Sequence, residues 1–306
     1  MKQITSILFL TLLAGNLIAQ RTVDALTLSG RFGLPASYEN TYNEKATENG
    51  AYLGVTYGKV IANKTMAVLS LNHFYFNVQG DPSIPANTAN PIILNGTILR
   101  VGIYRKFNNG HAFQLLAAPR FMSDYNNPDK NSLQMGALAM YEKDFREDLL
   151  MGFGAMFNKE LFGLYVVPIV NLEWKLNSRW SIAGMLPIYA KVNYHASDKL
   201  TVGFSHFGLV TSYYLGDEDY AGDYMERQSI DLSLFARQRL FWNVFIEGRA
   251  GRSFGRNYKQ FAGDQTIDFG IPLVYFGDNR TMKNVTFGDG MLFDVRLVLN
   301  MTKTAF

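Results

Sequence analysis

The sequence predicts an all-β protein, a transmembrane antiparallel up-and-down β-barrel of 12–14 strands that follows an N-terminal signal peptide. Three observations predict this fold class. Apolar and polar residues alternate with period two along nearly all of the chain after residue 20. Short and long polar connections alternate between these segments. Charged residues make up only 18% of the 306 residues, below the roughly 25% of an average soluble protein.

The alternation is clearest in residues 229–240, where Ile230, Leu232 and Leu234 fall on one face. Asp231, Ser233 and Arg237 fall on the other face, and the segments 97–107, 164–176 and 290–301 repeat the pattern. Successive side chains of a strand point to opposite faces, so each segment has one apolar and one polar face. A helix would need apolar residues at i, i+3 and i+4, which these segments do not show.

We expect 14 candidate strands, an even number that leaves both chain ends on the same side of a membrane. Their ranges are 22–35, 50–60, 65–78, 94–107, 111–122, 132–143, 149–158, 163–176, 179–187, 190–196, 199–215, 226–240, 243–256 and 290–301. The pair 179–187 and 190–196 is short, and the count is 12 if it does not cross. Residues 265–276 also have a strand pattern and either form a hairpin within a loop or replace that pair.

The first twenty residues have the layout of a secretory signal peptide. Lys2 supplies the positive charge, residues 4–13 are mostly apolar, and Ala19-Gln20 marks a plausible cleavage point. The apolar run is too short to span a bilayer, which needs about 20 residues. A buried core helix is the alternative interpretation. We therefore expect residues 1–20 to be a signal peptide and residues 21–306 to form the barrel.

A soluble β-sandwich in the periplasm is the alternative to a membrane barrel. The apolar faces recur along the whole chain, which is more than one sandwich interior would bury. Aromatic residues gather near strand ends, as at Tyr104 and Phe107 or Trp174 and Trp180, a pattern typical of interface girdles. The chain also ends in an aromatic residue, Phe306, although it is out of phase with the apolar face before it. We expect the outer membrane of a Gram-negative bacterium.

One stretch resembles a particular family. It runs from Leu186-Pro187 through residues 191–194 and 197–200 into a long strand that ends at Tyr213-Tyr214. This stretch is similar to a segment of the family catalogued as domain of unknown function 6268, among the outer-membrane β-barrels of Gram-negative envelopes. The resemblance implies a location and a fold, and it implies no activity.

The composition excludes several classes of chemistry. The chain has no Cys, which excludes disulfides, thiolate catalysis and Cys-based metal sites. A net charge of +3 gives no argument for nucleic acid as a partner, and the sequence contains no phosphate-binding glycine motif. We expect no cofactor and no metal. The expected partners are outer-membrane lipid, the barrel-assembly machinery and a small-solute ligand.

Two motifs suggest catalysis, and we expect neither to provide it. Residues 251–255 spell the G-x-S-x-G of hydrolases, but that motif needs a strand, a sharp turn and a helix, and here it lies within an alternating strand. His195 and Ser197 have the spacing of outer-membrane phospholipases, with Asn193 in phase. They also sit beside a predicted turn, where Ser is common for backbone reasons. We expect the protein not to be an enzyme.

The polar faces of the strands carry charges of both signs. Because Arg or Lys on the lipid face costs about 2–4 kcal/mol at mid-depth, we expect these side chains to point into the barrel. The candidates for lumen or constriction residues are Arg100, Arg120, Glu173, Lys175, Asp231, Arg237, Arg239, Glu247, Arg249, Asp294 and Arg296. The seven from Asp231 onward are expected to form one cross-strand ion-pair network, which either stiffens a narrow interior or forms an anion-favouring constriction.

Three functions remain open. The leading hypothesis is a passive channel or ligand-conducting barrel for small polar or amphipathic solutes. The second is a structural or surface-interaction barrel with a closed lumen, whose long loops contact a partner. The third is a lipid-modifying enzyme that uses His195 and Ser197.

Overall fold

The computed structural model describes residues 22–38 and 42–302. The predicted signal peptide at residues 1–20 and the terminal Phe306 lie outside the described residues. Among the described residues, no helix is long and apolar enough to cross a bilayer.

Strands make up most of the described chain. They are β1 (Thr22–Gly33), β2 (Thr47–Ala62), β3 (Thr65–Gln79), β4 (Ile92–Lys106), β5 (His111–Ala117), β6 (Arg120–Ser123), β7 (Leu133–Gln134), β8 (Gly136–Arg146), β9 (Leu149–Glu160), β10 (Gly163–Lys175), β11 (Trp180–Leu186), β12 (Tyr189–His195), β13 (Leu200–Tyr214), β14 (Tyr224–Phe241), β15 (Val244–Phe261), β16 (Phe269–Ile271), β17 (Val274–Phe276) and β18 (Gly290–Thr302).

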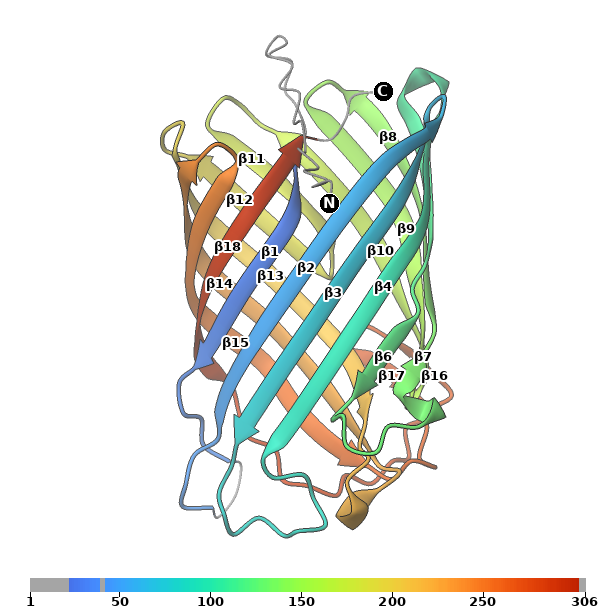
Figure 1. Cartoon of the computed structure of the whole chain (residues 1–306), viewed down its shortest axis with the longest axis vertical. Coiled ribbons are helices and arrows are strands. Elements are labelled where there is room, and N and C mark those ends of the chain that lie inside the picture. Colours follow the sequence, from blue (N-terminus) through green and yellow to red (C-terminus); the bar gives the residue numbers. More distant parts are fainter. Residues whose placement is uncertain (1–21, 39–41, 303–306) are drawn as a thin grey trace, which may run out of the picture.

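The strands close into an antiparallel barrel with 14 wall strands (Figure 1). Each wall strand pairs with its neighbour in sequence, β15 pairs with β18, and β18 pairs with β1 to complete the ring. β5 and β6 count as one wall strand, because β4 pairs with both, and β7 and β8 count as another, because β7 continues into β8. The predicted 14-strand barrel is confirmed.

The short pair of the prediction, β11 and β12, belongs to the wall, so the count is 14 rather than 12. Residues 265–276 form a hairpin within a loop, β16–β17, which was one of the two predicted alternatives. This hairpin has three residues in each strand, and β16 pairs with the wall strand β10 in parallel.

The outer surface of the barrel is apolar. The outward-pointing side chains of the wall are exposed Leu, Ile, Val and Phe residues in nearly every wall strand. Examples are Leu28, Val55, Leu69, Val101, Phe153, Val170, Phe204, Leu234, Ile246 and Val295. This apolar outer face, together with a closed ring of backbone hydrogen bonds, is the architecture of a transmembrane β-barrel.

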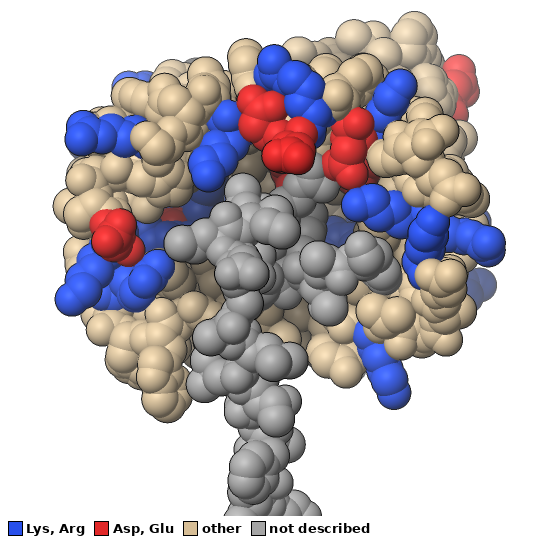
Figure 2. Space-filling model, turned by 90° about the horizontal axis from the view of Figure 1, so that it is seen from above, with Lys and Arg blue, Asp and Glu red and all other residues tan. Residues whose placement is uncertain are grey.

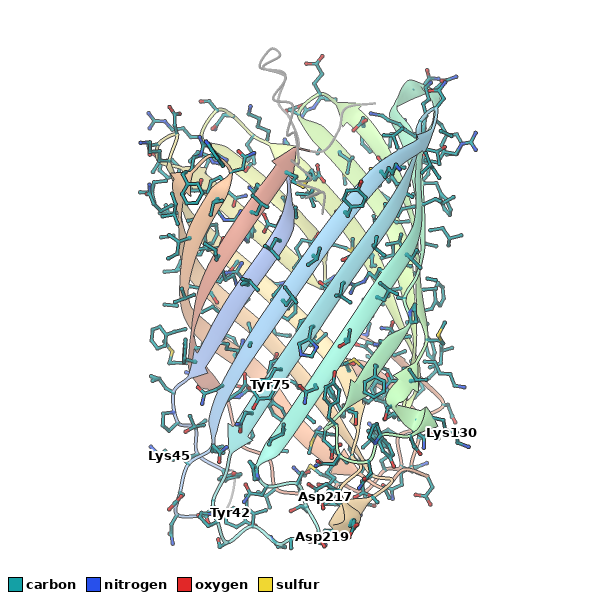
Figure 3. The ribbon with its side chains drawn as sticks, viewed as in Figure 1. Tyr42, Lys45, Tyr75, Lys130, Asp217 and Asp219 are labelled. Carbon is teal, nitrogen blue, oxygen red and sulfur yellow. The ribbon has the colours of Figure 1, made fainter. Side chains whose placement is uncertain are left out.

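The two ends of the barrel differ. At the terminal end, where β1 begins and β18 finishes, the strands are joined by short turns (Figure 1). Lys, Arg, Asp and Glu side chains gather around the rim at this end (Figure 2). At the opposite loop end the connections are long, and Tyr42, Lys45, Asp217 and Asp219 lie in them beyond the strands (Figure 3).

The core lies inside the barrel at the loop end, because the lower parts of β13, β14 and β15 lie inside the ring. Their inward face packs against the wall strands β3, β4 and β6. This first apolar cluster includes Phe76, Val78, Leu94, Ile98, Met122, Tyr213, Met225, Tyr258 and Phe287. The interior is therefore filled across this half of the loop end.

The opposite face of the same strands packs against β8, β9 and β10. The second apolar cluster includes Leu116, Leu138, Met140, Phe162, Tyr165, Val167, Ile169, Tyr224 and Phe261. Glu226 and Ser212, which by register point toward the outside of the sheet, are fully buried here. The loop end thus has three layers: wall, inner sheet and wall.

Candidate functional site

The inner surface of the terminal half carries a charge cluster centred on Glu247 in β15. Oε2 of Glu247 lies 2.6 Å from Nε of Arg237 and 2.9 Å from Nζ of Lys191. Its Oε1 lies 2.6 Å from Arg249, and Arg237 also contacts Asp24 at 3.1 Å. We call Asp24, Lys191, Arg237, Glu247 and Arg249 the terminal cluster. Lys191 and Arg237 are partly exposed, so solvent reaches this cluster.

A second cluster lies at the boundary with the loop half and is centred on Glu48 in β2. The guanidinium of Arg31 lies 2.5 Å from Glu48 and 2.5 Å from Asp231. Arg227 and Arg256 each lie 3.6 Å from Glu48. We call these five residues the central cluster. Its side chains are buried or nearly so, and a carboxylate taken from water needs such partners to remain charged.

Hydroxyl groups complete the central cluster. Tyr258 donates a hydrogen bond to Glu48 at 3.0 Å, and Ser253 donates one to Asp231 at 2.7 Å. Ser253 also accepts a hydrogen bond from Arg31 at 2.8 Å. Ser253 is the serine of the G-x-S-x-G motif, and it lies within β15 as the alternation predicted. Its hydroxyl is committed to an interior hydrogen-bond network.

A third set of contacts fastens β13 to the far wall. Arg120 in β6 lies 2.9 Å from Glu160 at the end of β9, and both side chains are buried. Glu160 accepts hydrogen bonds from the backbone N–H of Ser212 at 2.9 Å and from its hydroxyl at 2.8 Å. These contacts satisfy part of the backbone on the edge of β13 that β12 leaves unpaired.

The structure divides the predicted ion-pair network into separate groups. Arg237, Glu247 and Arg249 meet in the terminal cluster. Asp294 and Arg296 pair with each other at 3.3 Å on β18, and Asp231 instead pairs with Arg31. The physical reason is that β1 closes the ring beside β18. This register sets Arg31 opposite Asp294 and brings a guanidinium that the prediction did not include.

The other candidates lie apart from these groups. Arg239 is exposed at the end of β14, with its guanidinium 5.5 Å from the ring centre of Phe245. Lys175 is exposed at the end of β10, and Glu173 lies on the same inward face. Arg120 forms the buried ion pair with Glu160. Arg100 in β4 forms no ion pair with any carboxylate of the described residues.

Sequence reasoning missed several interior charges. Arg256 is out of phase with Arg249 in a regular strand, and it was not among the predicted lumen residues. Gly255 has φ +57°, and the pairing with β14 shifts there, which marks a bulge. The bulge turns Arg256 and Tyr258 inward, and Gly255 was the available signal. Lys191 lies in the predicted strand 190–196, but its face was not assigned. Glu48 lies in β2 just before the predicted strand 50–60, because the observed strand begins earlier, at Thr47.

The inward face of β10 changes character along its length. Toward the terminal end it carries Glu173 and Asn171, and toward the loop end it carries Ile169, Val167 and Tyr165. The inward face of β8 changes in the same way, from Glu142 to Met140 and Leu138. The inner surface is therefore amphipathic, with a polar half directly adjoining the second apolar cluster.

The polar half contains solvent-accessible space. Tyr189 lies two residues from Lys191 on β12, so its side chain points inward, and it is 45% exposed. Arg100 and Glu173 face the same region, and both are partly exposed. We call this region, around Arg100, Glu173 and Tyr189, the vestibule. It joins the terminal cluster above to the second apolar cluster below.

His195 and Ser197 make separate contacts. The ring nitrogens of His195 lie 3.1 Å from the hydroxyl of Thr201 and 3.2 Å from that of Ser181. The hydroxyl of Ser197 accepts hydrogen bonds from the backbone N–H of Lys199 and Leu200, as a turn residue does. Within the described ranges, no group of three or more His, Asp or Glu side chains is arranged to hold a metal ion.

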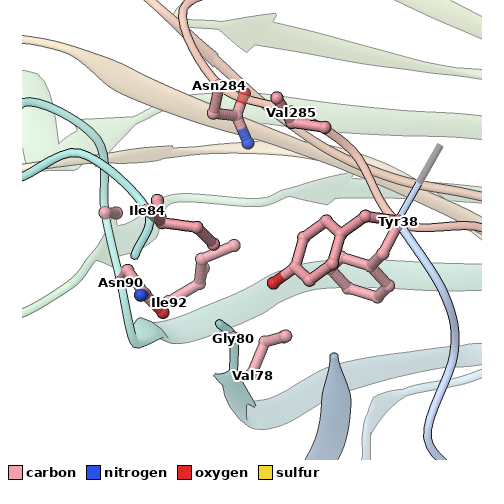
Figure 4. A pocket seen from close by; sticks show the side chains of 10 residues that line it. Tyr38, Val78, Gly80, Ile84, Asn90, Ile92, Asn284 and Val285 are labelled. Atoms are coloured by element: carbon pink, nitrogen blue, oxygen red, sulfur yellow. The ribbon is translucent and has the colours of Figure 1, made fainter. Parts of the chain in front are cut away.

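A small pocket lies among the loops at the loop end (Figure 4). Tyr38, Ile84, Asn90 and Val285 are among its lining residues. Asp81, at its edge, accepts hydrogen bonds from Ser83 and from the backbone N–H of Glu44, and these bonds lower the pKa of its carboxyl. The pocket is a gap between neighbouring loops. It does not open into the barrel, because the first apolar cluster lies beneath it.

Solved structures similar to this chain are outer-membrane proteins. An outer-membrane channel from Pseudomonas putida F1 has 9% identity and a TM-score of 0.45, with 94% of this chain and 100% of that chain covered. A FadL homologue from Pseudomonas aeruginosa has 11% identity and a TM-score of 0.47, with 92% and 90% covered. The NanC porin has 12% identity and a TM-score of 0.37, with 90% and 99% covered. Similarity this distant carries no argument about activity.

No protein with a curated description matches the chain. A family model does match it. The model is described as Domain of unknown function (DUF6268) and covers residues 62–266, about two thirds of the chain. This range contains the stretch from Leu186 to Tyr214 on which the predicted resemblance rested. The chain belongs to this family.

Proposed function

We propose that the protein is an outer-membrane barrel of a Gram-negative bacterium that conducts a small amphipathic solute with an anionic head. The observation that carries this proposal is the amphipathic inner surface of β10, where Glu173 and Asn171 give way to Ile169 and Val167. The inner sheet covers the lower part of the apolar half, and the partly buried Ile188 and Val210 border it where it adjoins the polar half. A solute with a polar head and an apolar tail matches both halves.

The membrane placement rests on the apolar outer face. Outward side chains such as Leu234, Phe153 and Val295 are exposed, and burial of such surface contributes about 25 cal/mol per Å². Lipid supplies that burial for a barrel. By the usual orientation of outer-membrane barrels, the terminal end faces the periplasm and the loop end faces outward. Outer-membrane lipid and the barrel-assembly machinery are then the expected partners.

Arg100 is the proposed partner of the anionic head. It lies on the inward face of β4 and forms no ion pair with any described carboxylate, whereas Arg120, Arg237 and Arg249 are each paired. A partly buried guanidinium without a counter-ion attracts an anion, and its planar fork fits carboxylate, sulfonate or phosphate oxygens. The tail would then lie beside Ile188 and Val210, the partly buried residues that border the second apolar cluster.

The test uses an alkyl sulfonate that carries a fluorescent group. Its head stays ionised, so it does not cross a bilayer as a neutral acid. Liposomes containing the protein are loaded with the probe on both leaflets, and albumin then extracts the probe from the outer leaflet only. With the protein present, the inner-leaflet probe should also become extractable. Retention of the inner half with folded protein would contradict the proposal.

Arg100→Gln should slow extraction about tenfold, corresponding to the loss of about 1.4 kcal/mol of charge-assisted binding. Arg105→Gln is the matched control, because Arg105 lies on the same strand, is exposed, and packs against Phe107 at the rim. The control should extract at the rate of the unaltered protein. Equal rates for the two variants would remove Arg100 from the proposed site.

One observation favours a second function, a structural or surface-interaction barrel with a closed lumen. The first apolar cluster and the central cluster fill the loop end, so the described residues leave no straight path along the barrel axis there. On this alternative the loops around Asp217 and Lys45 contact a partner outside the cell. The alkyl sulfonate test separates the two functions, because a purely structural barrel does not accelerate extraction.

A further inference from the structure

The wall of the barrel is incomplete between β10 and β13. β11 pairs with β10 only from Val170 to Lys175, so the edge of β10 from Leu164 to Ile169 has no neighbour from β11. β12 pairs with β13 only as far as Phe207, so β13 beyond Gly208 has no neighbour from β12. The turn of the β11–β12 hairpin, at Pro187, is the upper boundary of this interruption.

The hairpin β16–β17 occupies the lower part of the interruption. Leu164 and Tyr165 of β10 pair with Phe269 and Gly270 of β16. This pairing is parallel, in contrast to the antiparallel pairs of the wall, and it covers only two residues. A two-stranded hairpin of this length is marginal without further support. The β16–β17 hairpin is therefore part of a loop that inserts into the wall, and it is not one of the wall strands.

The base of the hairpin is held by polar contacts with β14. The hydroxyl of Tyr275 donates to Glu226 at 3.0 Å, and Arg280 lies 2.7 Å from the same carboxylate. The ring of Tyr275 also packs against Phe162 and Tyr165 of the second apolar cluster. These contacts fix one end of the hairpin, from the inner side.

The tip of the hairpin is free by comparison. Leu273 is 91% exposed and has a positive φ of +72°, which is unusual for a branched residue. Val274 and Phe276 beside it are also exposed. In water such a cluster of apolar side chains would be costly, whereas at the lipid-facing surface of a barrel it is favourable. The tip therefore belongs against lipid.

Both sides of the interrupted wall are apolar. Outside, Leu164, Pro168 and Leu186 are exposed around the hairpin. Inside, the hairpin covers the second apolar cluster, and Ile188 and Val210 border it from the strands above and beside it. Displacement of the hairpin tip would join the apolar part of the interior to the surrounding lipid by a mostly apolar slot, with the Glu226–Arg280 ion pair at its edge.

We propose that β16–β17 is a movable closure of a lateral opening, through which the apolar tail of a single-chain anionic amphiphile passes between the interior and the membrane. The inference rests on the proposed function and specifies the path that the solute takes through the wall. The head remains at Arg100 in the vestibule while the tail lies beside Ile188 and Val210, which border the opening. The route avoids the loop end, which the first apolar cluster fills.

The test locks the hairpin to the wall. The chain has no Cys, so a disulfide can be introduced without side reactions. Leu164→Cys with Phe269→Cys places two thiols at paired positions of β10 and β16. Leu234→Cys with Ala250→Cys is the matched control, at paired positions of β14 and β15 in the intact wall. Each pair is assayed oxidised and reduced with the fluorescent alkyl sulfonate and albumin.

Oxidation of the first pair should slow extraction at least tenfold, and reduction should restore it. Oxidation of the control pair should leave the rate unchanged. Equal rates for the oxidised and reduced first pair, with extraction still accelerated, would overturn the lateral route while the proposed function stands. Absence of accelerated extraction in the reduced protein and the unaltered protein would overturn both.

A second measurement does not depend on passage. A spin label at Leu273→Cys should be relaxed by oxygen, which concentrates in lipid, more strongly than by a water-soluble nickel complex. The same label at Asp217→Cys, in the adjacent long connection, should show the opposite preference. A label at position 273 that the nickel complex relaxes more strongly would place the tip in water and overturn the lateral opening.

Discussion

The two halves of the interior are built from the same strands and differ in what fills them. In the terminal half, solvent reaches Asp24, Lys191 and Arg237 around the buried Glu247, and Tyr189 is 45% exposed. In the loop half, β13, β14 and β15 extend beyond their neighbours, and both faces of these strands are covered by apolar clusters. Strand length, rather than closure of the ring, therefore decides where the barrel is open and where it is filled.

The largest expected effect breaks the charge balance of the buried half. Glu48→Ala leaves Arg31, Arg227 and Arg256 without their shared carboxylate, and should lower the free energy of unfolding by about 3–5 kcal/mol. Glu247→Ala in the terminal cluster should cost clearly less, because water reaches Lys191 and Arg237. Urea unfolding in detergent measures both. Equal losses would remove the distinction between the halves.

A smaller effect distinguishes two buried tyrosines of the loop half. The hydroxyl of Tyr258 bonds to Glu48 and accepts from Arg227, so Tyr258→Phe should destabilise the protein by about 1–3 kcal/mol. The hydroxyl of Tyr213 is buried and has no hydrogen-bond partner among the described residues. Tyr213→Phe should therefore be neutral or stabilising by about 1 kcal/mol. Comparable destabilisation by the two variants, under the same urea titration, would contradict this assignment.

The strand pattern was predictable from the sequence because period-two alternation is a local property. All 14 predicted wall strands are observed, and the hairpin within 265–276 was one stated alternative. The register was not predictable, since it decides which strand neighbours which charge. Arg31 meets Asp231 only because β1 closes the ring beside β18.

The inner sheet at the loop end was hidden from the alternation for a different reason. An apolar face packed against lipid and one packed against another layer of protein have the same pattern. The available signals were exceptions to it: Glu226 and Ser212 lie on the face that points outward in the rest of β13 and β14. Because a carboxylate is costly at the lipid face, its presence there indicates a strand segment that is covered by protein.

The most direct test of the division between an accessible and a filled half is conductance of the refolded protein in a planar bilayer. We predict no discrete ohmic openings, because the first apolar cluster and the central cluster close the loop end, even where the same preparation accelerates extraction of the alkyl sulfonate. Sustained openings with a stable conductance would contradict axial closure, and would return Arg237, Arg249 and Arg296 to consideration as a pore constriction.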